Sequence, residues 1–111
     1  METTTLPYRA VLISEDGYLT PRSYKDYKDM NRLIGAEYGT VVTVPGLGDE
    51  NTRIDLWVDD EGLLTGRKHN PMASGFCGQT IMGHALVTAV DPNTGESKDL
   101  PHNYHRILLG F

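Results

Sequence analysis

Apolar residues at helical spacing mark one clear helix, over residues 23–34. Its inward side is predicted to carry Tyr24, Tyr27, Met30 and Ile34, with Leu33 at the edge, and its outward side Lys25, Lys28, Asp29 and Arg32. Ser23 can cap the first turn, and Asp26, three residues later, completes a capping box. Gly35 is placed to end the helix in the left-handed conformation.

Strand patterns lie on both sides of this helix. Residues rich in strand formers, or alternating between apolar and polar, predict strands over residues 8–14, 38–44, 52–59, 63–65 and 80–90. The clearest alternation places Ile54, Leu56 and Val58 on the core side, and Arg53, Asp55, Trp57 and Asp59 on the other side. Turn residues separate the strands at residues 15–17, 59–62 and 91–95.

The remaining segments complete a single domain over residues 1–111. Residues 1–7 are predicted to form a loose arm and residues 45–51 a loop, and a short final helix is expected from Pro101 to Gly110. The order of strand, helix, three or four strands and helix predicts an α+β fold. We expect a small, mostly antiparallel sheet, with the main helix packed on one face and a short C-terminal helix.

Composition narrows the classes of function. The chain has 10 Lys and Arg against 15 Asp and Glu, and its net charge of −5 argues against non-specific binding to nucleic acid. The single cysteine, Cys77, excludes an internal disulfide and a metal site made of cysteines alone. No apolar run reaches the length of a membrane span, and no secretory leader pattern opens the chain. We therefore expect a cytoplasmic protein without a membrane partner.

The strongest candidate for a binding site is the segment over residues 66–78. It joins three glycines to Arg67, Lys68, His69 and Asn70 in an acidic chain, and it shows neither helical nor strand periodicity. Arginine offers a planar fork that suits phosphate or carboxylate, and lysine adds a point charge. A solvated connection whose Asn-Pro sets a turn is the competing interpretation. The spacing matches neither a phosphate-binding loop of the Walker type nor a dinucleotide fingerprint.

Two aromatic residues are candidates for stacking on a ligand, Trp57 and Tyr38. Trp57 stands on the polar side of an alternating strand, where an exposed ring would suit a stacking surface or a subunit interface. The alternative is that the C-terminal helix covers this face and Trp57 belongs to the core.

Other reactive residues carry weaker hypotheses. Cys77 could act as a nucleophile only with a base such as His69 or His84 beside it, and a small buried residue is the simpler interpretation. His102 and His105 have a spacing that metal sites use, but a third ligand is missing, so we expect no metal and no cofactor. The acidic groups at residues 49–50 and 59–61 coincide with turns and are interpreted as solvated loops.

Short motifs give the chain a family resemblance. They are Ile-Gly-Ala-Glu-Tyr at residues 34–38, Val-Asp-Asp-Glu-Gly-Leu-Leu at 58–64, Asn-Pro-Met-Ala at 70–73, and Ile-Met-Gly-His-Ala-Leu-Val at 81–87. Over about residues 8–90 the chain resembles a family of short, largely uncharacterised proteins of phages, plasmids and bacteria. The resemblance implies a phage or mobile-element origin, in which small acidic proteins often act stoichiometrically against host defence.

These observations favour a binding protein over an enzyme. We expect it to hold a small anionic, nucleotide-derived ligand, with Arg67 and Lys68 on phosphate, His69 and Asn70 on polar edges, and Trp57 or Tyr38 stacked. A homo-oligomer would complete the pocket, and the ligand would be a signal sequestered to counter host defence in the host cytoplasm. The alternatives are an inhibitor that binds a host enzyme through acidic loops and Trp57, and a small hydrolase or transferase using Cys77.

Overall fold

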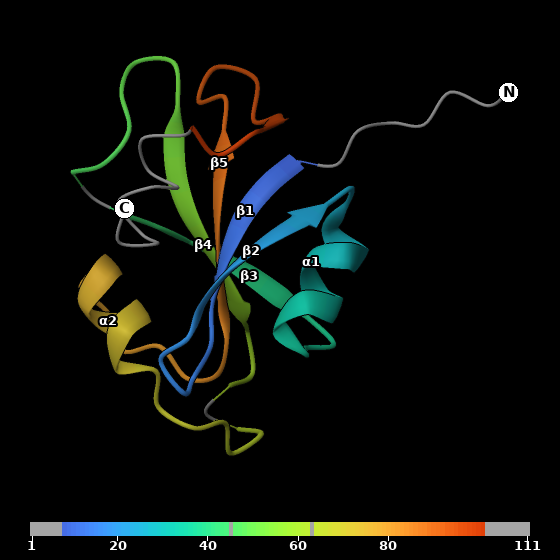
Figure 1. Ribbon diagram of the computed structural model, residues 1–111, viewed down its shortest axis with the longest axis vertical. Coiled ribbons are helices and arrows are strands. Elements are labelled where there is room, and N and C mark those ends of the chain that lie inside the picture. The colour runs from blue at the N-terminus through green and yellow to red at the C-terminus, as the bar shows by residue number, and fades with distance from the viewer. Residues whose placement is uncertain (1–7, 45, 63, 102–111) are drawn as a thin grey trace, which may run out of the picture.

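Six antiparallel strands form one sheet in the computed structural model, which describes residues 8–44, 46–62 and 64–101 (Figure 1). The strands are β1 (Tyr8–Ile13), β2 (Leu19–Tyr24), β3 (Gly39–Thr43), β4 (Arg53–Asp59), β5 (Ala85–Val90) and β6 (Ser97–Lys98). Their order across the sheet is β2-β1-β5-β4-β3, and β6 pairs with the end of β5. The α+β fold with a mostly antiparallel sheet is therefore confirmed. The predicted arm at residues 1–7 and the final helix, with His102 and His105, lie outside the described residues.

The sheet carries an apolar core on each face because its central strands are apolar on both sides. Val87 and Ala89 of β5 point to the same face as Ile54 and Leu56 of β4, and these four side chains are fully buried there. Leu86 of β5 points to the opposite face and is equally buried. The predicted alternation of β4 is confirmed, and the predicted apolar strand is central, although β5 begins at Ala85 instead of residue 80.

Two helices cover the two faces, one each. Helix α1 (Tyr27–Ile34) packs on the face of Leu86, where Ile34 is buried, and α2 (Pro71–Cys77) packs on the face of Val87 through Ala73 and Cys77. In Figure 1 they stand on opposite sides of the sheet, α1 at the right and α2 at the left. We call these the α1 face and the α2 face.

The predicted start of the first helix is wrong. Ser23 and Tyr24 end strand β2, where they pair with Arg9 and Tyr8 of β1. Asp26 is the helix cap instead, because its carboxylate accepts from the backbone N–H of Asp29 at 3.0 Å. Strand β2 went unrecognised because it is an edge strand with exposed residues at its centre, which leaves no apolar alternation to read.

The later start of α1 also changes which of its side chains are buried. Tyr27, predicted on the core side, is 60% exposed, and Asp29, predicted to point outward, is buried. The predicted helix end is confirmed, because Gly35 caps α1 with φ of 70°.

Two further predictions are corrected between β4 and β5. Residues 66–78 are not an aperiodic loop, since residues 71–77 form α2. The predicted strand over residues 63–65 is wrong for the part that the structure describes, because Leu64 and Thr65 lie in a turn; Leu63 lies outside the described residues. The hydroxyl and N–H of Thr65 bond back to the carbonyl of Glu61, which gives this segment local partners in place of a neighbouring strand.

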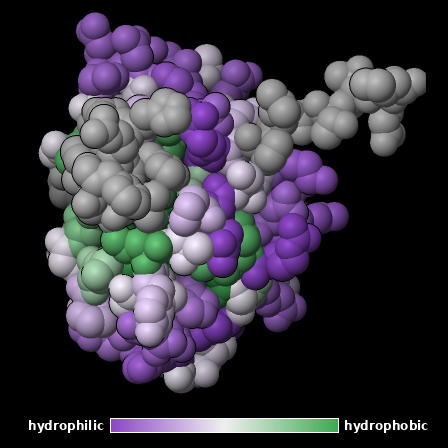
Figure 2. Space-filling model, viewed as in Figure 1, coloured by the Kyte–Doolittle hydropathy of each residue, from purple (hydrophilic) through white to green (hydrophobic). Residues whose placement is uncertain are grey.

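The surface is polar over most of its outline. Figure 2 shows hydrophilic residues at the top and along the α1 side at the right, with hydrophobic residues in the middle of the visible face. None of the helices in the described part of the chain is long and apolar enough to cross a membrane.

Candidate ligand-binding groove beside helix α1

The predicted cationic loop does not act as one unit, because its two cations extend to different parts of the fold. Arg67 reaches Asp59 at the end of β4, whereas Lys68 reaches Asp16 in the turn between β1 and β2. The structure therefore does not bring the two cations together, and each has a carboxylate partner of its own.

The side chain of Arg67 connects its own segment to two others through hydrogen bonds. Its Nε donates to Oδ2 of Asp59 at 3.0 Å, and its Nη2 donates to the backbone carbonyl of Gly35 at the end of α1. The Arg67 side chain is 27% exposed and that of Asp59 only 5%, so this ion pair is largely shielded from water. Gly83 lies beneath the Arg67 stem, close enough that an added Cβ would be 3.3 Å from the arginine Cδ.

Lys68 and His69 lie at the surface. The Lys68 ammonium is 2.9 Å from a carboxylate oxygen of Asp16, and this hydrogen bond raises the pKa of Lys68. Both side chains of the pair are more than half exposed, so the interaction is of the weak surface type. His69 is exposed, with its Nε2 at 3.3 Å from the hydroxyl of Ser74.

Asn70 lies in the interior and holds α2 against the sheet. Its Oδ1 accepts from the N–H of Ala73 at 3.0 Å, which caps the helix. Its Nδ2 donates to the carbonyls of Ile13 at 3.0 Å and Gly83 at 2.9 Å. Both amide hydrogens are thus used in the fold, and the residue is 1% exposed.

The candidate nucleophile Cys77 is buried at the end of α2 among apolar side chains. The sulfur contacts that the structure gives are with the carbonyls of Ser74 and Gln79, and none is with His69 or His84, the two described histidines that could activate the thiol. His84 accepts from the N–H of Glu15 at 3.1 Å through Nδ1. Within the described ranges, no three His, Cys, Asp or Glu side chains are arranged to hold a metal ion.

A groove of about 500 Å³ lies between α1 and the start of β3. Three aromatic side chains line it: Tyr27 comes from the first turn of α1, Tyr38 from the residue before β3, and Trp57 from β4. Tyr27 and Tyr38 are 60% and 59% exposed, so both rings are accessible to a ligand. The volume lies within the range of small-molecule sites.

Trp57 is half-buried, so its exposure lies between that of a free stacking surface and that of a core residue, the two interpretations of the sequence. It packs against the core of the α1 face, and its indole Nε1–H donates to the side-chain oxygen of Asn31 at 2.8 Å. Gly39 of β3 lies directly on the indole, because an added Cβ there would overlap Trp57 and Asn31. The glycine and the hydrogen bond together set the position of the ring at the base of the groove.

The groove carries two cations that sequence reasoning missed, Lys28 and Arg32. They are four residues apart on α1 and both line the groove, together with one carboxylate, Glu37. Arg32 also forms an ion pair with Asp29, while Lys28 has no carboxylate partner among the described residues. The sequence placed Lys28 and Arg32 on the outward side of the helix, but it gave no sign that this side borders Tyr38 and Trp57.

A smaller hollow of about 260 Å³ adjoins the groove and contains Arg67. The two share Glu37 and Tyr38, so Tyr38 stands between Arg67 on one side and Trp57 on the other. Of the six residues predicted to bind ligand, the structure thus gathers Trp57, Tyr38 and Arg67 in one region. It places Lys68, His69 and Asn70 elsewhere.

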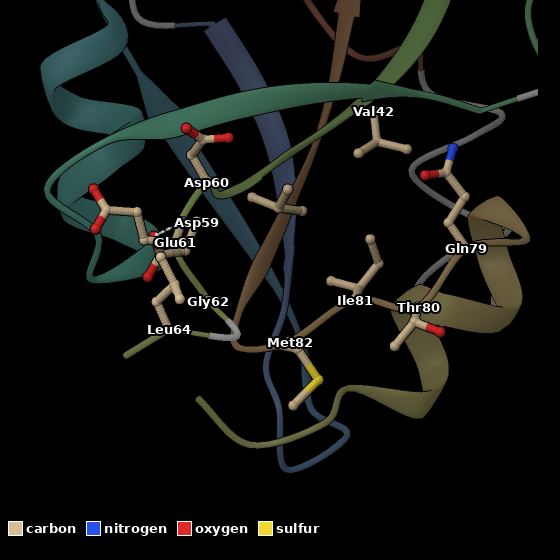
Figure 3. A pocket seen from close by; sticks show the side chains of 11 residues that line it. Val42, Asp59, Asp60, Glu61, Gly62, Leu64, Gln79, Thr80, Ile81 and Met82 are labelled. Carbon is tan, nitrogen blue, oxygen red and sulfur yellow. Dashed lines mark hydrogen bonds between the residues drawn. The ribbon is translucent and has the colours of Figure 1, made fainter. Parts of the chain in front are cut away.

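The α2 face has a pocket of a different character, with a volume of about 350 Å³ (Figure 3). Val42, Ile81 and Met82 supply an apolar lining, and Asp60 and Glu61 stand at one end. The carboxylates disfavour an anionic ligand here. Sequence reasoning interpreted the same acidic groups as a solvated turn.

Comparison with known proteins identifies the family but no activity. A domain of unknown function, DUF3846, matches residues 8–109, which extends beyond the resemblance over residues 8–90. No curated protein and no solved structure matches the chain. The chain belongs to the DUF3846 family.

Proposed function

We propose that this chain binds a small anionic ligand with a planar group, of the nucleotide class, in the groove beside α1. The observation that carries the proposal is the juxtaposition of three aromatic rings with Lys28 and Arg32 in one groove of an acidic chain. Aromatic faces suit the stacking of a base, and cations suit a phosphate. Asn31 and Glu37 add polar atoms that could fix the orientation of the ligand.

The contributions of the groove residues follow from their positions. Lys28 has no carboxylate partner among the described residues, so its ammonium is available to a phosphate. Arg32 keeps further N–H groups beside the pair it forms with Asp29. Tyr27 and Tyr38 present exposed rings that line the same groove, so a planar group could lie against them. Arg67 is excluded from the ligand contacts, because it is paired with Asp59 in a hollow that also holds Glu37 and Glu61.

The test uses Trp57, which is the one tryptophan of the chain, as a fluorescent probe. Adenosine monophosphate, cyclic AMP and a cyclic dinucleotide are each titrated into the protein, and thermal stabilisation is measured in parallel. At least one of them is expected to change the Trp57 emission and to raise the melting temperature. If none changes either signal up to millimolar concentration, the proposal is overturned.

Two variants that each remove one positive charge test whether the ligand binds in the groove or at the segment over residues 66–78. Lys28→Gln is expected to weaken binding by about tenfold or more, because a hydrogen bond to a charged group contributes about 1.5–3 kcal/mol and about 1.4 kcal/mol corresponds to tenfold. Lys68→Gln removes a surface cation outside the groove and is expected to leave the affinity unchanged. The reverse result would assign the site to the segment over residues 66–78.

Sequestration differs from catalysis in its stoichiometry. The proposed binder takes up one ligand per groove and releases it unchanged. Chromatography of the ligand after long incubation with the protein checks whether it is unchanged. The accumulation of a product would overturn sequestration in favour of an enzyme. The phage origin and the role against host defence are supported by the family resemblance alone, and expression of the chain in cells under phage challenge tests that role.

A second candidate function is favoured by the pocket on the α2 face. Apolar Val42 and Ile81 beside Asp60 and Glu61 suit a basic, partly apolar segment of a protein partner. This is the predicted inhibitor of a host enzyme, but without Trp57, which lies on the α1 face. The double variant Asp60→Asn, Glu61→Gln should weaken capture of such a partner and leave nucleotide titrations unchanged.

A further inference from the structure

We infer that two copies of this chain pair through β3 to form one continuous antiparallel sheet. Strand β3 lies at the end of the sheet order, and β4 is the only strand that pairs with it among the described residues. An edge of this kind presents a row of backbone N–H and C=O groups that can add a further strand.

The hydrogen-bond pattern shows which residues of β3 have backbone groups on the free side. Val44 donates to Ile54 at 3.0 Å, and Tyr38 accepts from Asp60 at 2.9 Å, so the even-numbered residues bond to β4. Because bonded and non-bonded positions alternate in an antiparallel pair, the backbone groups of the odd-numbered residues point away from β4. These residues are Gly39, Val41 and Thr43.

The three outward residues are evenly spaced about Val41, so a second copy can add to this edge in a two-fold arrangement. In a two-fold arrangement, Val41 faces Val41 of the partner subunit, and Gly39 faces Thr43 of the partner subunit. Each facing pair exchanges two hydrogen bonds, so no outward group of the strand is left without a partner.

The charge along the strand also favours self-association. Strand β3 contains only glycine, threonine and valine, so two copies of a chain with net charge −5 can meet here without like charges in contact. The opposite edge, β2, contains Pro21 and the exposed Arg22, two features that block the addition of strands.

Three exposed apolar residues lie at or beside the same edge. Val41 is 43% exposed, and the flanking Tyr38 and Leu47 are exposed as well. Pairing would cover Val41 on both copies. It would also place Thr43 of the partner subunit beside Gly39, at the rim of the groove, so that the second copy borders the ligand site.

The first test is the mass of the protein in solution. Analytical ultracentrifugation from micromolar to millimolar concentration is expected to show a monomer–dimer equilibrium. Val41→Pro removes an N–H that the pairing needs, and Val41→Lys sets two like charges opposite each other, so both variants should be monomeric. The N–H of Val41 makes no bond to β4, so its loss in Val41→Pro costs the folded chain little. Ser23→Lys, on the exposed part of β2, is the matched control and should dimerise like the parent chain. A parent chain that stays monomeric, or variants that still dimerise, would overturn the inference.

Amide hydrogen exchange gives a second readout that does not depend on a variant folding. At low concentration Thr40 and Val42 should be protected and Gly39, Val41 and Thr43 should exchange fast. At high concentration all five should be protected. Protection of the odd-numbered amides that persists in the monomer would mean that another segment covers the edge, and it too would overturn the inference.

Dimerisation and ligand binding can fail separately. The groove residues named above all come from one copy, so monomeric Val41→Lys is expected to retain binding in the Trp57 titration. A dimer that binds no nucleotide would overturn only the proposed function. A strict monomer that binds nucleotide would overturn only the proposed pairing.

Discussion

The guanidinium of Arg67 lies 3.0 Å from the buried carboxylate of Asp59 and also donates to the carbonyl of Gly35. One side chain thus connects the segment before α2, the end of β4 and the end of α1. A cation at this position also complements the negative end of the α1 dipole. The residue that sequence reasoning assigned first to a ligand is therefore part of the framework beside the groove.

Replacing Arg67 with Met should destabilise the fold by about 3 kcal/mol, because it leaves the Asp59 carboxylate buried without its partner. Urea denaturation followed by Trp57 fluorescence measures the change. Lys68→Met breaks the exposed pair with Asp16 and serves as the control, with little expected change in stability because both side chains are in water. Equal effects of the two substitutions would contradict the assignment of Arg67 to the framework.

Asn70→Asp should destabilise the protein more than Asn70→Ala. The aspartate would place an acceptor against the carbonyls of Ile13 and Gly83, whereas alanine removes the cap and leaves those carbonyls without this donor. We expect at least about 2 kcal/mol for the alanine variant, from the lost cap and the unpaired buried groups. Met72→Ala, at an exposed position of α2, is the control and should have little effect on the melting temperature.

Two glycine-to-alanine substitutions should change stability in opposite directions. At Gly39 the added methyl group overlaps Trp57 and Asn31, so we expect a loss of about 1–3 kcal/mol and an altered Trp57 emission. At Gly75, inside α2, the added Cβ meets no atom of the described chain within 4 Å, and a gain of about 0.5–1 kcal/mol is expected. A neutral Gly39→Ala would show that the indole is free to move.

The contribution of the Asp29 carboxylate to the stability of the fold should disappear in acid. The backbone N–H of Lys25, followed by the charge of Arg32, holds the pKa of Asp29 below its ordinary value although burial opposes this. Because the folded state favours the carboxylate, its contribution is present above the ordinary pKa of about 3.9 and is lost as the pH falls through the lower folded value.

Urea denaturation of Asp29→Asn and the parent chain at several pH values checks this sign. The parent chain should be more stable at neutral pH, and the difference should narrow below about pH 4. Asp60→Asn, at an exposed turn, is the control and should show no comparable convergence. If the difference in unfolding free energy between Asp29→Asn and the parent chain stays constant down to low pH, the stability does not depend on the ionisation of Asp29.

Local sequence signals predicted several elements correctly. The alternation of Ile54, Leu56 and Val58 identified the core side of β4, and Gly35 marked the end of α1. Helix α2 also carried local signals that were missed, because Asn70 before Pro71 is a cap followed by a favoured first helical residue, and Gly78 ends the helix with φ of 76°. The Asn-Pro pair had been interpreted as a turn.

The candidate groove was predictable only in part. Trp57 and Tyr38 stood out because large aromatic residues occur at polar or flanking positions of strands, and both line the groove. Lys28 and Arg32 could not be assigned to it, because the outward side of a helix gives no sign of which neighbouring strand it overhangs.

Patterns along the chain settled the class of fold, the strands β1, β3, β4 and β5 and the net negative charge, since periodic burial depends on residues a few positions apart. Contacts between distant segments decided the rest: the pairing of polar β2 with β1, the burial of Asn70 beneath α2, and the separation of Arg67 from Lys68. A polar side chain takes the partner that the fold brings within hydrogen-bonding distance, and for these residues the partner lies up to 57 positions away.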